Sequence, residues 1–194
     1  MRSIAVPLDA QPLRAIRADA RLWQLAAAHP PFTTSPVPDT LPEISHAVLA
    51  ALPTGSGWVD HFADRSFQQA EYLLDPVGFR RAHSWAQRER TTAYRTVHGD
   101  EVFAEHATSA QGMTWRCSST AFLSDALDRI DALDLAAARQ EFSVADMIAQ
   151  GVYKQRPDED DDHAADRVLT TLRAFSRHCR VVVADGLDLI FEQH

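Results

Sequence analysis

The sequence has very little lysine and cysteine, and it has no long apolar run. Lys154 is its single lysine, and Cys117 and Cys179 are its two cysteines. Two thiols cannot build a disulfide framework or a four-thiolate zinc site. No apolar segment approaches the ~18 residues of a membrane-spanning helix, and residues 1–7 lack the apolar core of a signal peptide. These absences predict a cytoplasmic protein that does not enter a membrane.

Positive charge is also scarce. The chain has 19 basic and 27 acidic residues, for a formal net charge of −8. Five of the negative charges lie together in residues 158–162, and removing them leaves −3 for the rest of the chain. Nucleic-acid binding requires clustered lysine and arginine, whereas these arginines are scattered. We therefore expect no nucleic-acid ligand, and the charge favours a protein partner that binds through an acidic surface.

The usual catalytic and cofactor-binding motifs are missing. The sequence has no Gly-x-Ser-x-Gly nucleophile motif and no dinucleotide-binding fingerprint. Gly55-Ser56-Gly57 is too short for a phosphate-binding loop and lacks the lysine of such a loop. We therefore expect no cofactor and no metal, and the leading hypothesis is a non-enzymatic binding or protein-interaction module.

What the sequence does contain is the composition of one globular domain. Hydrophobic residues make up 45% and charged residues 24% of the 194 residues, as is ordinary for a folded chain. Because domains usually have ~100–200 residues, a single domain over residues 1–194 is expected.

Hydrophobic periodicity predicts both strands and helices in the first two thirds of the chain. The predicted strands cover residues 2–6, 101–106 and 113–117, and the predicted helices cover residues 12–27, 43–52 and 58–74. Five prolines predict irregular structure over residues 29–42, and Asp75-Pro76 is expected to end the third helix.

The C-terminal part is predicted to be richer in helix. Ser119 can cap an amphipathic helix that extends to Leu133, and Asp134 and Ser143 can cap two short helices after it. The expected fold is therefore α+β, with several helices packed on a small mixed or antiparallel sheet.

Two structures are open for the last segment. Residues 181–183 could form a strand with a hairpin turn at Asp185-Gly186. The apolar residues from Asp166 onward keep helical phase, however, which favours a helix to Ala184 that ends at Gly186. Residues 187–191 would then form a closing strand.

Residues 64–74 resemble the Asp-Lys-x-Trp-x-x-Leu-x-x-Leu-Leu helix of the YfbM-like family, a bacterial family of unknown function. The similarity continues through Gly112-Met113-Thr114-Trp115, residues 127–134 and 139–142, Met147 and Val152-Tyr153. The resemblance covers most of the chain and implies an α+β fold, with a terminal helix and strand over residues 166–191. Arg65 stands where the family has lysine, and it could not replace a lysine that reacts as an amine, because arginine stays protonated.

His61, Asp64 and Arg65 are the strongest candidates for a binding site. They are three or four positions apart, so on a helix they would share one side. His61 and Arg65 could then bind an anion while Asp64 selects the histidine tautomer. The alternative is an exposed ion pair at the start of a helix, worth only ~0–1 kcal/mol.

An enzyme is the alternative to the binding module. Its site would lie between residues 60–65 and 112–117, with His61 or His106 as the acid–base group. This hypothesis requires His61, Arg65 and Trp115 to line one concavity. Trp115 could line such a groove, but an aromatic residue at the start of an element is more often part of the core.

Two further polar segments are weaker candidates. His98, Asp100, Glu101 and His106 could form a metal or acid–base group, although two histidines eight positions apart have no standard ligand spacing. Residues 158–162 resemble a calcium loop but lack its glycine and its final glutamate, so a solvated acidic loop before the last helix is preferred.

Overall fold

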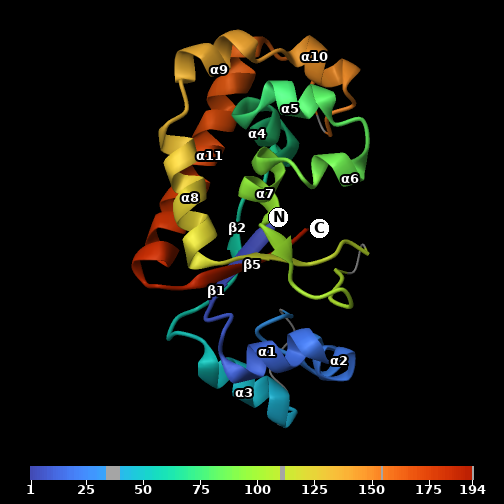
Figure 1. Cartoon of the computed structure of the whole chain (residues 1–194), viewed down its shortest axis with the longest axis vertical. Helices are drawn as coiled ribbons and strands as arrows, with labels where there is room; N and C mark the ends of the chain where they lie inside the picture. The colour runs from blue at the N-terminus through green and yellow to red at the C-terminus, as the bar shows by residue number, and fades with distance from the viewer. Residues whose placement is uncertain (34–39, 110–111, 154, 194) are drawn as a thin grey trace.

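In the computed structural model, which describes residues 1–33, 40–109, 112–153 and 155–193, one antiparallel sheet separates two layers of helices (Figure 1). The strands in these residues have the order β2-β1-β5-β4-β3. Their bounds are Arg2–Val6 for β1, Val59–Asp60 for β2, Glu101–Val102 for β3, Arg116–Ser118 for β4 and Asp188–Glu192 for β5. The predicted α+β class is confirmed, and the sheet is the antiparallel one of the two alternatives.

The two central strands are buried on both faces, which is why helices cover both sides of the sheet. Successive side chains of a strand point to opposite faces. Ile4 of β1 and Ile190 of β5 accordingly belong to one hydrophobic cluster, whereas Leu189 and Phe191 belong to the other. Each face needs its own layer of helices to exclude water.

The lower layer in Figure 1 contains α1 (Gln11–Ala18), α2 (Ala20–Ala27) and α3 (Glu43–Ala51). The single helix predicted over residues 12–27 is wrong, because Asp19 interrupts it. The Asp19 carboxylate accepts hydrogen bonds from the backbone N–H groups of Arg21 and Leu22 and so begins a second helix. The aromatic core of this layer contains Trp23, Phe32, Phe103 and Trp115.

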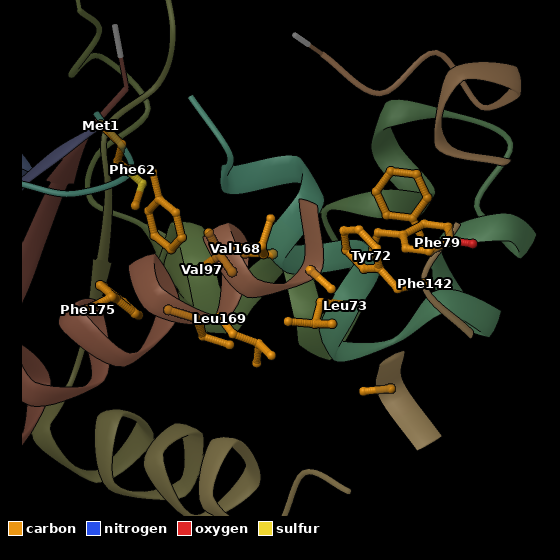
Figure 2. Close-up of a cluster of buried hydrophobic side chains, with 14 of the residues drawn as sticks. Met1, Phe62, Tyr72, Leu73, Phe79, Val97, Phe142, Val168, Leu169 and Phe175 are labelled. Atoms are coloured by element: carbon orange, nitrogen blue, oxygen red, sulfur yellow. The ribbon is translucent and has the colours of Figure 1, made fainter. Parts of the chain in front are cut away.

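The upper layer contains the remaining helices and the larger core. Their bounds are Phe67–Leu74 (α4), Pro76–Arg81 (α5), Trp85–Arg88 (α6), Thr92–His98 (α7), Thr120–Asp131 (α8), Leu135–Glu141 (α9), Val144–Ala149 (α10) and Asp161–Ala184 (α11). Figure 2 shows Leu73 of α4 and Leu169 of α11 among the buried side chains of this layer. None of the helices in the described residues is long and apolar enough to cross a membrane.

The predicted C-terminal part is confirmed. Ser119, Asp134 and Ser143 cap α8, α9 and α10 with their side chains. The helix alternative for residues 181–183 is the one adopted, since α11 continues to Ala184 and β5 follows. Gly186 has a φ of +66°, a left-handed conformation that glycine adopts readily after a helix.

The helix predicted over residues 58–74 is wrong in its first half. Residues 59–60 form β2, residues 61–66 form a turn, and the helix begins only at Phe67. Phe62 and Arg65 have φ values of 51° and 63°, in the left-handed region that an α-helix cannot include. His61, Asp64 and Arg65 therefore do not share one side of a helix.

The two predicted inner strands are shorter than expected. Only Glu101–Val102 and Arg116–Ser118 pair as strands. Beyond them the backbone N–H of Phe103 still donates to Trp115, but Trp115 in turn donates to Ala107, which is part of a turn. Within the predicted irregular segment 29–42, residues 34–39 lie outside the described part of the chain.

Candidate functional site

His61 lies in the turn after β2, where it is buried and electrically neutral. Its Nε2 is 2.8 Å from the Ser3 hydroxyl, and the ring of His178 packs beside it with centroids 4.8 Å apart. Burial, with smaller contributions from His178 and the N-terminal ammonium group, lowers the pKa of His61 to about 4. At neutral pH His61 carries no charge with which to attract an anion.

Asp64 pairs with Arg167 of α11 rather than with His61. It accepts hydrogen bonds from the Ser66 hydroxyl at 2.6 Å and from Nη1 of Arg167 at 2.7 Å. Partial burial alone would raise the pKa of Asp64, but these hydrogen bonds outweigh it and hold that pKa below its usual value. Asp64 thus joins the turn to the long C-terminal helix.

Arg65 and Trp115 lie in two other places. Arg65 donates to the phenol oxygen of Tyr153 at 2.8 Å. Trp115 is only 3% exposed and packs against Trp23 at 4.9 Å, in the core on the opposite side of the sheet from His61. The four candidate residues therefore do not line one concavity, and the arrangement that the enzyme alternative required does not form.

A different polar cluster lies inside the upper layer, around His98 at the end of α7. His98 and Glu71 of α4 are each 1% exposed, and Nε2 of His98 is 2.7 Å from Oε1 of Glu71. Arg88 donates to both oxygens of the same carboxylate, at 2.8 and 3.0 Å. A buried carboxylate is tolerated in this position because a bidentate guanidinium and an imidazole both hydrogen-bond to it.

The hydrogen bonds of His98 determine its tautomer. Because ionised Glu71 can only accept, Nε2 of His98 carries the proton and donates it. Nδ1 is then an acceptor, and it lies 2.6 Å from the side-chain amide nitrogen of Gln193. Tyr94 stacks on the ring at 4.3 Å and Phe67 meets it edge-on at 5.3 Å, so the imidazole is held in one orientation.

A cavity of about 230 Å³ opens above His98. We call it the His98 pocket; its walls come from α4, α6, the two ends of the chain and two loops. The lining residues are Met1, Phe67, Gln68, Trp85, His98, Met113, Tyr153 and Gln193. Figure 1 shows the two chain ends close together below α6 and α7, because β1 pairs with β5.

Two aromatic side chains of this pocket face the solvent. Trp85 is 43% exposed and Tyr153 is 42% exposed, and no other aromatic residue in the described part of the chain is more than intermediate in exposure. Exposed apolar side chains gathered around a concave surface are typical of binding sites.

Sequence reasoning placed His98 with the wrong partners and did not select Glu71. Asp100 forms an ion pair with Arg95, and His106 bonds to the backbone carbonyl of Ile16 in the other layer. The feature of the sequence that could have revealed this cluster is Glu71, a charged residue that lies between Ala70 and Tyr72 among apolar residues of α4. An ionisable residue inside such a run is buried only when another element supplies its partner.

The acidic stretch at residues 158–162 was predicted to be a loop before the last helix, but α11 already begins at Asp161. Glu159 pairs with Arg167, and Asp160 caps α11 and bonds to His163. The Asp161 carboxylate accepts from the backbone N–H of Val144. Among the described residues, no group of three or more histidine, cysteine, aspartate or glutamate side chains is arranged to hold a metal ion.

Comparison with known proteins identifies the fold. No family model matches the chain. No curated protein matches it either. Among solved structures, YfbM from Escherichia coli, a protein of unknown function, matches with a TM-score of 0.57 over 98% of each chain, at 11% sequence identity. At this low sequence identity the match establishes only the fold. The chain therefore has a YfbM-like α+β fold.

Proposed function

We propose that the protein is a non-enzymatic binding module and that its ligand occupies the His98 pocket. The observation that carries this proposal is the exposure of Trp85 and Tyr153, which both line one cavity of about 230 Å³. Leaving two large aromatic surfaces in water is unfavourable by ~25 cal/mol per Å² of apolar area, so a ligand that covers them gains that free energy.

The walls of the pocket define the body of the ligand. Phe67 and Tyr153 stack with their centroids 6.1 Å apart and their planes inclined by 26°, and Trp85 contributes a third aromatic surface. Aromatic faces prefer offset stacking with another ring. A small, flat and largely apolar molecule fits these walls best.

His98 supplies the polar anchor. Glu71 holds the proton on Nε2, which leaves Nδ1 as an acceptor at the base of the pocket. A ligand N–H or O–H that replaces the amide of Gln193 at Nδ1 would be bound by the same geometry. One well-placed polar contact among apolar walls is the usual basis of orientation in small-molecule sites.

The polar contacts of the pocket support binding more than catalysis. The residues that line the cavity, within the described ranges, include no serine, threonine, cysteine or lysine that could act as a nucleophile.

A basic protein that binds the acidic surface is a less well supported partner. The reason is that Glu159, Asp160 and Asp161 already have partners within the fold. The scarcity of lysine still argues against a nucleic-acid ligand, and a cytoplasmic location remains part of this proposal.

The proposal is tested with 2-naphthylmethanol, a flat neutral probe with one hydroxyl donor. In a titration followed by two-dimensional amide NMR, we expect shifts to centre on residues 67–68, 98 and 153. Trp85→Ala should weaken binding by about tenfold, which corresponds to the ~1.4 kcal/mol expected for the loss of one stacking wall.

Leu25→Ala is the matched control, because Leu25 is an exposed apolar residue of α2 in the other layer. It should leave the affinity unchanged. Shifts that centre on another surface, or binding that Trp85→Ala does not weaken, would show that the pocket is not the site.

A further inference from the structure

We propose that the ligand of the His98 pocket carries an anionic group, a carboxylate or a phosphate, and that Arg65 and Arg156 bind this group beside the pocket. This inference rests on the proposed function and adds the charge of the ligand to it. Tyr153 lines the pocket, and its hydrogen-bond partner Arg65 lines a second hollow.

Tyr153 connects the two places. Its ring lines the His98 pocket, and its phenol oxygen accepts a hydrogen bond from Nη1 of Arg65 at 2.8 Å. The guanidinium of Arg65 therefore lies at the far end of a pocket wall, within reach of a substituent on a ligand that stacks on that wall.

Arg65 differs from three arginines whose side chains pair with carboxylates. Arg88 ends on Glu71, Arg167 ends on Glu159, and Arg80 ends on Asp146. Arg65 crosses 88 positions of the chain to reach a neutral phenol. Within the described residues no carboxylate pairs with it. A guanidinium has five N–H donors arranged to bind a carboxylate or phosphate in a bidentate manner.

The hollow beyond Tyr153 has a volume of about 580 Å³ and contains a second arginine. Arg156 lines it and is exposed, without a carboxylate partner in the part of the chain that the structure describes. Two guanidinium groups therefore line one hollow, in a protein of net charge −8.

Two acidic residues, Asp64 and Asp158, line the same hollow. Asp64 is engaged by Ser66 and Arg167, whereas Asp158 is exposed and is the one remaining counter-charge on the lining. Gln155 adds a buried side-chain oxygen that has no hydrogen-bond donor among the described atoms.

The backbone turn directs Arg65 toward Tyr153. Arg65 has a φ of 63°, and its N–H donates to the carbonyl of Phe62 at 2.7 Å, which closes the turn. A left-handed conformation is uncommon for arginine and is retained where the surrounding contacts enforce it.

The test compares 2-naphthylmethanol with two anionic probes of the same ring system, 2-naphthoate and 2-naphthyl phosphate, by calorimetric titration at low ionic strength. We expect at least one anionic probe to bind about tenfold more tightly than the neutral one, as is typical of a hydrogen-bonded charge pair. The preferred anion distinguishes a carboxylate ligand from a phosphate ligand.

Arg65→Gln and Arg156→Gln should each remove most of the preference for the anionic over the neutral probe. Arg14→Gln, an exposed arginine of α1 in the other layer, is the control and should change neither affinity. Thermal melting establishes that each variant is folded.

The outcomes separate the two proposals. If the neutral probe binds in the His98 pocket and neither anion binds more tightly, the charge assignment is wrong and the proposed function stands. An anion preference that survives both substitutions would show that other residues bind the charge. If none of the three probes binds, both proposals are overturned.

Discussion

At the scale of single residues, the buried histidine His61 makes folding sensitive to acid. Its folded pKa of about 4 lies below the ordinary value of 6.5, mainly because of burial. The unfolded chain therefore takes up a proton between these values that the folded chain does not. The contribution of His61 to the free energy of unfolding is fully present above pH 6.5, and it decreases as the pH falls toward 4.

We expect the free energy of unfolding to decrease by about 2 kcal/mol between pH 7.5 and pH 5 through His61 alone. His61→Gln, which keeps a neutral hydrogen-bonding side chain, should remove this part of the pH dependence. Urea unfolding at both pH values measures it. His163→Gln, at an exposed histidine paired with Asp160, is the control and should not remove it. An unchanged pH dependence in His61→Gln would show that the imidazole is not shielded.

The Glu71 carboxylate holds the polar network together. Glu71→Ala would leave Arg88 and His98 without their shared partner in a buried place. Removing one member of a buried ion pair costs about 3–5 kcal/mol. We expect a loss of this size by urea unfolding, and a much smaller loss for Glu101→Ala, because Glu101 is exposed where it pairs with Arg17. Equal losses would indicate that Glu71 is solvated.

The sequence identified the polar candidate residues, but it did not predict which of them contact one another in the fold. Glu71 and His98 are 27 positions apart and come together only because α4 packs against α7. His61 and Arg65 are four positions apart and diverge, because a turn replaces the helix that would have aligned them. Local spacing predicts proximity only where the local structure is known.

At the scale of elements, the junction between α7 and β3 determines where His98 lies. Gly99 has a φ of +105°, and a Cβ added there would lie 2.9 Å from Cδ2 of Phe191 and 3.0 Å from Cβ of Arg116. The junction can therefore lie against β4 and β5 only because residue 99 has no side chain.

Gly99→Ala should destabilise the protein by about 2 kcal/mol or more, because it adds a steric clash to the strain of the left-handed backbone. Gly55→Ala is the matched control. Gly55 has a φ of +83°, but no described heavy atom lies within 4 Å of its added Cβ, so only about 1 kcal/mol of strain is expected. Thermal unfolding compares them, and similar losses would contradict the close contact at Gly99.

The predicted bounds of helices and strands were most accurate where a capping residue lay at the start of a long segment with helical hydrophobic periodicity. This was so for α8 and for the C-terminal helix and strand. The errors occurred where a single polar side chain breaks a helix, as at Asp19, or where non-glycine residues take left-handed conformations, as at Phe62 and Arg65. Such conformations depend on tertiary contacts that periodicity does not contain.

At the scale of the whole molecule, the two helical layers share one sheet, and we propose that they unfold as one domain. Trp23, Trp58 and Trp115 lie in or against the lower core, whereas the long helix α11 lies in the upper layer. Because three of the four tryptophans lie in or against the lower core and Trp85 lies in the upper layer, fluorescence is weighted toward the lower layer. Far-ultraviolet circular dichroism is weighted toward the upper layer, which has most of the helical residues.

We expect the two signals to give the same unfolding curve in urea, as two-state unfolding requires. Trp115→Ala should shift both curves together, by about 3–5 kcal/mol, because it empties part of the lower core. Curves that separate, or a shift confined to the fluorescence signal, would show that the layers unfold independently.

We claim that the His98 pocket is a ligand site, and a crystal structure with bound 2-naphthoate is the decisive test. We predict the naphthyl ring between Trp85 and Tyr153, with its carboxylate directed toward Arg65. Electron density for the probe at another surface, such as the groove between α8 and α11, with the His98 pocket empty, would contradict the claim.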